Sequence, residues 1–509
     1  MQGRRVASLL ASVAAGAAFC ARASDVAALF DGLALAAPLK PYADHNPIMT
    51  QKYGADPFVI SHGGRVYVYM TSDAEIMAGG VVQKNDYSNC KAVRVVSSAD
   101  LVNWTEHPAI KVAGPDGPAP WAGVAWAPSA AYRTVNGRTA FFLYFANGAG
   151  GIGVLRADSP TGPFTDPLGR ALISRSTEGV AGVVWLFDPG VFVDDDGRAY
   201  IYFGGGVPEG KAADPGTMRV AELGPDMTSL VPGSVKAFPV PYAFEASAMN
   251  KVGDTYYYTY CVNFNVPPGQ SIQSGTIAYM TSKRPTDGFE LKSTLLQHPG
   301  AMFGIKGGNN HQDLFEFKGR HYIAYHSRVL AAYMGYDDDG KPSAEGTGYR
   351  STHIDAIGDI ADGTMPKVAG TRKGVAQVGH FDPYQVVEAA TIGAMAGIST
   401  AEYRPEGAAA GRMKVTGIHP GDWIAVYGVD FGSGAKQFRC RVTPPPAGGA
   451  GAIQIRRGGL DGTPVGYVKV EPGKADYTVD LLQTVAGAHD LVFVFHGTGW
   501  DFEEWQFIK

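Results

Sequence analysis

The sequence predicts an all-β protein, a five-bladed β-propeller followed by a β-sandwich of the jelly-roll type. A short phrase recurs five times over residues 41–370, at spacings of roughly sixty to seventy residues. Glycine is abundant, with 67 residues, and aromatic residues make up 11% of the chain, a composition that favours strands and turns. Over residues 384–509 the phrase is absent, and short strands separated by Gly and Pro turns predict the sandwich.

Each copy of the phrase begins with a polar or small residue, followed by an apolar run, a glycine turn and an aromatic strand, as in a β-hairpin. The opening residues are Asp56, Ala127, Asp188, Glu245 and His311. Matching positions of propeller blades lie around one axis, so we expect these residues to face one central pocket. The repeat requires apolar residues in the strands but does not require acids at the opening position.

The three acids among these residues indicate chemistry on sugars. Glycoside hydrolysis commonly uses two carboxyl groups, one ionised and one protonated, on opposite sides of the scissile bond. Crowded acids raise the pKa of at least one member. We therefore predict Asp56, Asp188 and Glu245 as the catalytic set. A lone Asp-Pro would indicate only a strand-entry turn, and the alternatives for the whole pocket are a non-catalytic sugar-binding propeller or an interaction propeller.

The ordered segments GADPF, WAP, FDPGVFVDDDG, FEASAM and NNHQDLFEFKGRHYIAYHS resemble glycoside hydrolase family 43. The resemblance implies a five-bladed propeller, an inverting mechanism and substrates built from arabinofuranose or xylose. It also implies that Asp56 is the general base, Asp188 the residue that orients the acid and adjusts its pKa, and Glu245 the general acid. An inverting pair is expected to stand roughly 6.5–9.5 Å apart.

Two further residues acquire expected roles from this resemblance. His311 is expected at the axis, near a calcium ion or its water shell, although a lone histidine is as often structural. Many relatives have a second histidine where this chain has Gln312. Arg350, in GYRSTHIDAI, lies in a segment similar to the branch that removes arabinose from arabinoxylan. Its guanidinium is expected to bind a sugar hydroxyl or hold a carboxylate, with a surface ion pair as the alternative.

Aromatic residues beside the acids are candidates for packing against sugar rings. The predicted substrate-binding residues are Trp126, Phe244, Asn310 and Arg350. Aromatics beside a propeller axis are equally expected in core packing.

The segments VVEAATIG, HPGDWIAVYGVDFGSGAKQFRCRV and GAHDLVFVFHGTGWDFEEWQF, within residues 384–509, resemble a family 6 carbohydrate-binding module. The resemblance implies a structural calcium, with Glu388 and Glu503 at acidic ligand positions. Sugar-binding aromatics common in relatives are absent near Gly417 and Lys474, and Asp501 stands where an asparagine is common. This domain is therefore expected to bind xylan weakly, to use another surface, or to support the propeller only.

The N-terminus predicts export. Arg4 and Arg5 precede an apolar stretch that ends in an Ala-x-Ala cleavage site, so residues 1–23 are predicted as a signal peptide and residues 24–40 as a leader. We expect a secreted or periplasmic protein with no membrane association after cleavage. The four cysteines, one of them within the signal, are too sparse for a disulfide framework.

A net charge of −5 argues against a nucleic acid partner. We expect a monomer, no organic cofactor, and a cell-wall polysaccharide such as arabinoxylan as substrate. The sequence thus predicts an inverting glycoside hydrolase that releases α-L-arabinofuranose, with a β-D-xylosidase as the nearest alternative.

Overall fold

The computed structural model describes residues 25–78, 81–135, 137–336, 347–408 and 410–509, and the predicted signal peptide lies outside them. Strands account for 46% and helices for 4%, which confirms the all-β prediction. One compact unit comprises Leu39–Leu101 and His107–Ala376. The other contains Gln377–Lys509, together with Val102–Glu106 and the described residues up to Pro38. In the described ranges, no helix is long and apolar enough to cross a membrane.

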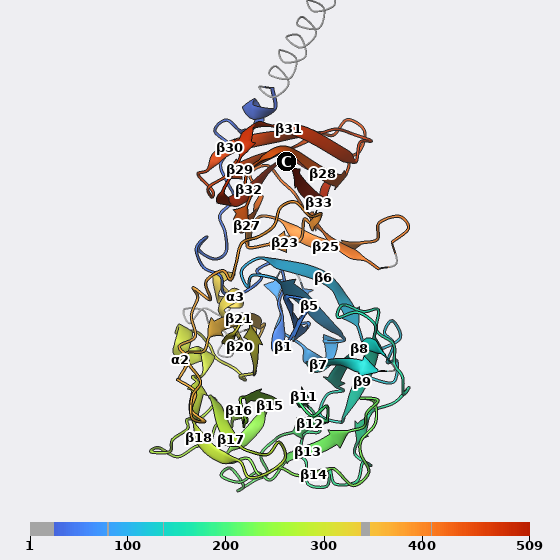
Figure 1. The fold of residues 1–509 in the computed structure, drawn as a ribbon, viewed down its shortest axis with the longest axis vertical. Helices are drawn as coiled ribbons and strands as arrows, with labels where there is room; N and C mark the ends of the chain where they lie inside the picture. The colour runs from blue at the N-terminus through green and yellow to red at the C-terminus, as the bar shows by residue number, and fades with distance from the viewer. Residues whose placement is uncertain (1–24, 79–80, 136, 337–346, 409) are drawn as a thin grey trace, which may run out of the picture. The chain divides into compact units, whose positions relative to one another are not determined.

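In the described part of the first unit, five antiparallel sheets of three or more strands follow one another along the chain (Figure 1). In hydrogen-bonded order their strands are β1 (Ala55–His62), β2 (Arg65–Thr71), β5 (Ala92–Ser98) and β6 (Trp104–Lys111); β10 (Ile173–Ser174), β9 (Gly151–Ala157), β8 (Arg138–Ala146) and β7 (Trp126–Val135); β11 (Gly190–Val193), β12 (Ala199–Gly204), β13 (Met218–Leu223) and β14 (Lys236–Ala237); β15 (Ala243–Val252), β16 (Thr255–Val262), β17 (Ile277–Ser282) and β18 (Glu290–Leu296); β19 (Gln312–Phe317), β20 (Arg320–Ser327) and β21 (Ser351–Ala356). The short elements are β3 (Met77–Ala78), β4 (Val81–Val82), η2 (Tyr87–Asn89), α2 (Pro299–Phe303) and α3 (Val329–Tyr333).

Consecutive sheets share apolar clusters. Tyr69 of the first sheet belongs to the same cluster as Leu143 of the second, and further clusters join the second to the third, the third to the fourth, and the fourth to the fifth sheet. A smaller cluster joins Tyr53, just before β1, to Leu330 and Tyr349 around the fifth sheet. The β-branched and aromatic residues of these strands suit such packing because both faces of each sheet are covered.

A bulge marks the start of the first strand in several sheets. The backbone is left-handed at Asp56 (φ 49°), Ala127 (φ 39°) and Asp188 (φ 49°). In the fourth sheet the left-handed residue is Ala246 (φ 67°), so Glu245 precedes the bulge position. His311 is not among the positive-φ residues described and lies just before β19. Asp56, Ala127 and Asp188 thus share one backbone position, whereas Glu245 and His311 lie outside it.

The N–H groups of the left-handed residues reach the preceding sheet. Ala127 N–H donates to Thr71 Oγ1 (2.8 Å), and Ala246 N–H donates to Asp188 Oδ2 (3.0 Å). The fifth sheet meets the first in the same way, since Asp56 N–H donates to His326 Nδ1 (3.0 Å). The bulges thus connect neighbouring sheets where the acids lie.

The second unit is a sandwich of two antiparallel sheets around one apolar core that includes Phe438, Phe493 and Trp505. The strands of one sheet are β25 (Ser399–Tyr403), β26 (Arg412–Thr416), β33 (Asp501–Ile508), β28 (Ala435–Thr443) and β31 (Asp476–Val485), with β22 (Val387–Glu388) paired to β33; those of the other are β24 (Ala394–Ala396), β27 (Trp423–Asp430), β32 (Ala488–Gly497), β29 (Gly451–Arg457) and β30 (Thr463–Val470). Two further short elements are η1 (Ala28–Phe30) and β23 (Thr391–Ile392). The predicted leader packs on this sandwich, since Trp423 Nε1–H donates to the carbonyl oxygen of Ala36 (2.9 Å).

Candidate active site

The structure brings the three predicted acids together in the first unit. Asp56, Asp188 and Glu245 are buried, with 4%, 5% and 7% of their surfaces exposed. His311 lies between two of them, with Nδ1 3.6 Å from Asp56 Oδ1 and 3.8 Å from Asp188 Oδ2. Ala127, the remaining opening residue, is buried and carries no functional group. The first, third, fourth and fifth sheets therefore contribute side chains to one pocket.

Arg350 holds Asp56 from the segment that precedes β21. Arg350 Nη1 donates to Asp56 Oδ1 (2.8 Å) and Oδ2 (3.1 Å). The arginine is only 5% exposed, so the alternative of a surface ion pair is wrong.

Asp73 in turn fixes Arg350. Its Oδ2 accepts hydrogen bonds from the backbone N–H and from Nε of Arg350 (both 3.0 Å), and its Oδ1 accepts one from Nη2 (2.8 Å). A planar guanidinium bound along one side by Asp73 has its remaining Nη1 aimed at Asp56. Asp73 is a positioning residue for this pocket.

The environment of Asp56 favours its ionised form. Burial by itself would raise the pKa of this carboxyl, but the Arg350 guanidinium, together with His326 and His311, outweighs burial and holds the pKa below its usual range. Asp56 is therefore a carboxylate at neutral pH, as a general base must be.

The environment of the other two acids favours the protonated form. Burial, followed by the charge of Asp56, raises the pKa of Asp188 to about 8, against the hydrogen bond from Ala246 N–H. Burial, followed by the charges of Asp188 and Asp56, raises the pKa of Glu245 well above its usual value. A buried carboxylic acid that keeps its proton at neutral pH can donate it to a leaving oxygen.

Two histidines border Asp56. His326 Nε2 lies 3.0 Å from the carbonyl oxygen of Asn309, and its Nδ1 accepts the hydrogen bond from Asp56 N–H. These partners assign the proton of a neutral His326 to Nε2. Burial lowers the pKa of His311 to about 4, so its imidazole is neutral.

An ionised carboxylate and a protonated carboxyl group in one buried pocket are the two groups that glycoside hydrolysis requires. Comparison with known proteins gives the same answer. The family model described as "Glycosyl hydrolases family 43" matches residues 45–365.

The chain belongs to glycosyl hydrolase family 43. The family 6 carbohydrate-binding module model matches residues 388–509. The resemblance found in the sequence is thereby confirmed for both parts, and the chain is a glycoside hydrolase.

Relatives of this family 43 chain match it along nearly its whole length. An arabinoxylan arabinofuranohydrolase of Bacillus subtilis is 43% identical, covering 92% of this chain and 93% of the relative. One of Paenibacillus polymyxa is also 43% identical, covering 91% of this chain and 74% of the relative. A crystal structure of a Bacillus subtilis family 43 arabinoxylan arabinofuranohydrolase with cellotetraose has a TM-score of 0.87 and 42% identity, covering 93% of this chain and 99% of that one.

The other predicted substrate-binding residues differ in exposure. Trp126 is half-buried, and its Nε1–H donates to the carbonyl oxygen of Tyr87 (2.8 Å). Phe244 is half-buried and packs edge-to-face between Trp185 and Phe264, at centroid distances of 5.2 and 5.4 Å.

Asn310 is completely buried, and its Nδ2 donates weakly to the carbonyl oxygens of Gln297 (3.3 Å) and Gly275 (3.4 Å). Its Oδ1 is buried without a hydrogen-bond partner among the described residues, so the substrate-binding role of Asn310 stays a prediction. Its neighbour Asn309 is the residue whose side chain hydrogen-bonds Glu245.

Sequence reasoning missed Asp73, His326 and Asn309. Asp73 and His326 share a signal, because each lies at or just after the end of the second strand of its sheet, in TSD and YHS. A polar residue at the end of an aromatic strand is therefore a sequence signal for a residue of this pocket. Asn309 lies two residues before His311, and no pattern in the sequence predicts a role for it.

The predicted calcium residues of the module lie on paired strands. Glu388 is on β22 and Glu503 on β33, and Ala389 N–H donates to the carbonyl oxygen of Glu503 (2.9 Å). Glu503 Oε1 accepts a hydrogen bond from Thr443 Oγ1 (2.7 Å). In the ranges that the structure describes, no three His, Cys, Asp or Glu side chains form a metal-binding group. Two carboxylates nonetheless suit calcium, whose other ligands would be carbonyl or water oxygens.

Asp501, which the sequence singled out, is bound within the module. Its Oδ1 accepts a hydrogen bond from Thr416 Oγ1 (2.6 Å), and its Oδ2 lies 2.7 Å from Lys414 Nζ. Lys474 Nζ lies over the ring of Tyr477, 4.6 Å from its centroid.

Proposed function

We propose that this enzyme is an inverting α-L-arabinofuranosidase that removes arabinofuranose side chains from arabinoxylan. The observation that carries the proposal is the 43% identity to two arabinoxylan arabinofuranohydrolases, which extends over 92% and 91% of the chain. The residues that such chemistry needs lie in one buried pocket.

In the proposed mechanism, Asp56 takes a proton from water as the water attacks the anomeric carbon. Glu245 donates its proton to the departing xylan oxygen. Burial and the charge of Asp56, joined by the charge of Asp188 once Asp188 ionises, keep that proton on Glu245 until reaction. The opposite pKa shifts of Asp56 and Glu245 support this division of roles. Arg350 keeps Asp56 ionised and oriented.

We also propose that the five sheets are the blades of a closed propeller. The apolar clusters between consecutive sheets support this arrangement. So does the contact of the first sheet with the fifth, where Val59 N–H donates to Asp313 Oδ2 (2.8 Å).

Three further properties are proposed on sequence grounds. The protein is exported, by virtue of its predicted signal peptide. It acts as a monomer on cell-wall polysaccharide. Glu388 and Glu503 hold a structural calcium ion in the module. His311 lies near a second calcium ion, or its water shell, beside the acids.

The test is product identification after incubation of the purified protein with wheat arabinoxylan and, separately, with xylo-oligosaccharides. Arabinose from the polymer, lost in Asp56→Ala, is the expected result. Xylose from the oligosaccharides would replace the proposal by a β-D-xylosidase. If neither substrate releases a sugar, the remaining explanations are that the enzyme acts on another glycan or that the pocket binds sugar without cleaving it.

A further inference from the structure

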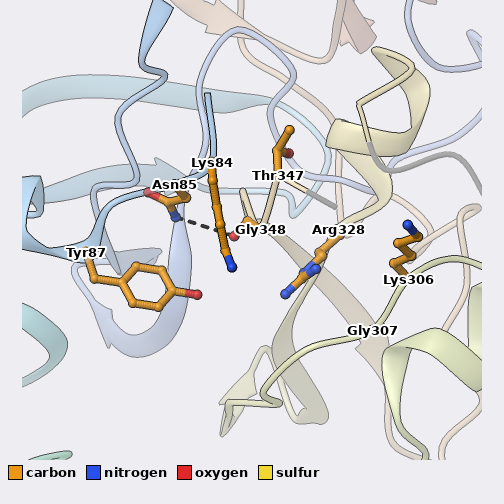
Figure 2. A pocket seen from close by; sticks show the side chains of 8 residues that line it. All are labelled: Lys84, Asn85, Tyr87, Lys306, Gly307, Arg328, Thr347 and Gly348. Carbon is orange, nitrogen blue, oxygen red and sulfur yellow. Dashed lines mark hydrogen bonds between the residues drawn. The ribbon is translucent and has the colours of Figure 1, made fainter. Parts of the chain in front are cut away.

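A cavity of about 480 Å³ opens beside the catalytic pocket in the same unit (Figure 2). Its size falls among small-molecule sites, which measure about 300–1,000 Å³. The described residues that line it are Lys84, Asn85, Tyr87, Lys306, Gly307, Arg328, Thr347 and Gly348.

Tyr87 connects this cavity to the catalytic groups. The guanidinium of Arg350 lies 4.8 Å from the centroid of the Tyr87 ring, and the same Arg350 binds Asp56. The Tyr87 carbonyl oxygen also accepts the hydrogen bond from Trp126. A ligand group in the cavity would therefore lie next to a sugar held at the acids.

The cavity has a marked positive character. Lys84, Lys306 and Arg328 come from three separate segments and line the same cavity, and Figure 2 shows the ends of Lys84 and Arg328 facing one region of it. Lys306 and Arg328 are half-buried, although such residues are mostly exposed in proteins. The described lining contains no acidic side chain. Each of the three cations also makes contacts within the protein, so a bound anion would join an existing network.

The rest of the lining suits a sugar ring. Tyr87 is 38% exposed and presents an aromatic surface, while Thr347 and Asn85 offer hydrogen-bonding groups. Asn85 N–H donates to the carbonyl oxygen of Thr347 (2.7 Å), which fixes the two segments that carry Lys84 and Gly348. A ligand with both a sugar ring and a carboxylate would use all of these groups.

We propose that this cavity is a subsite for a uronic acid substituent on the polysaccharide that the enzyme cleaves. The inference rests on the proposed function, because it concerns the same substrate at an adjoining position. The uronate carboxylate binds Lys84, Lys306 and Arg328, and its ring packs against Tyr87. The enzyme accordingly prefers arabinoxylan chains that carry acidic sugars.

The test uses two substrates that differ only in charge, an arabinoxylan rich in uronic acid and the same polymer after reduction of its carboxyl groups to alcohols. The measured quantity is the ratio of kcat/KM for arabinose release from the acidic and the reduced polymer. Because contacts between partly exposed charges are individually weak, we expect a ratio of about three to ten at low salt. High salt should reduce the ratio, since screening weakens such contacts.

The matched variants are Lys84→Met and Lys306→Met, singly and together, with Lys111→Met as an exposed control on β6. The expected result is a ratio that falls towards one in the double variant and stays high in the control. A ratio of one in the parent enzyme, or a high ratio that survives the double variant, would overturn the subsite. Absence of arabinose from both polymers would instead contradict the proposed function.

Discussion

Acidic residues in the two units of the molecule have different partners. In the sandwich, acids pair with cations near the surface, as Asp501 does with Lys414 (2.7 Å) and Glu504 with Arg412 (2.9 Å). In the catalytic pocket, Asp188 and Glu245 are buried, and in the described part of the chain neither has a Lys or Arg ion pair.

This difference explains which acids can perform chemistry. A buried carboxyl group without a cation keeps its proton, whereas one beside a guanidinium is ionised. Asp56 combines the two situations, because it is as buried as Asp188 but forms an ion pair with Arg350. One cation on one side of the pocket therefore distinguishes a base from an acid.

The largest effect is expected when either reacting carboxyl is removed without a change of shape. Asp56→Asn and Glu245→Gln should each lower kcat/KM for arabinose release by about 10²–10⁴-fold, the usual contribution of general acid–base catalysis. Asp313→Asn is the matched control, since Asp313 is also buried and accepts a hydrogen bond from Val59 N–H of the first sheet. An equal loss in this control would mean that burial rather than chemistry explains the effect.

Asp188→Asn should change the alkaline side of the pH profile. Asp188 has a pKa of about 8, and once it is ionised its negative charge helps to raise the pKa of Glu245. Without that charge Glu245 loses its proton at a lower pH, so the alkaline limb of kcat/KM should move down by about one pH unit. A limb that stays in place or moves upward would contradict the proposed role of Asp188.

Asp73→Asn should change the acidic limb of the pH profile of kcat/KM. Arg350 loses the charged partner that orients it, its hold on Asp56 weakens, and the depressed pKa of Asp56 rises. Activity is then lost at a higher pH, with the acidic limb moving up by about half a unit to one unit. Asp73→Glu, which retains the charge, should restore part of the original profile. A uniform loss at every pH would indicate a merely structural residue.

The smallest effect concerns the sandwich. If Glu388 and Glu503 hold calcium, chelation should lower the melting temperature of the module's transition by about 2–4 °C, because a ligand bound only to the folded state stabilises it. Glu388→Gln and Glu503→Gln should abolish the response, while the exposed Asp461→Asn should preserve it. The same fall in melting temperature in the parent and in all three variants would mean that Glu388 and Glu503 do not bind calcium.

The repeat predicted Asp56 and Asp188 correctly as members of one pocket because hairpin patterns are local in sequence. Glu245 was predicted for the same pocket, and it lies there although it stands one residue before the left-handed position, since a bulge adds a residue without altering the apolar pattern. Asp73 was missed because its partner Arg350 is 277 residues away. No spacing in the sequence encodes such a contact.

The partners of Asp56 all come from late in the chain. His326 is 270 residues further on, and Arg350 is 294. During synthesis, the carboxyl group at position 56 leaves the ribosome long before the guanidinium that keeps it ionised once it is buried. The nascent enzyme is consequently inert until its fifth sheet has folded back onto its first, so that completion of the fold and onset of activity are one event.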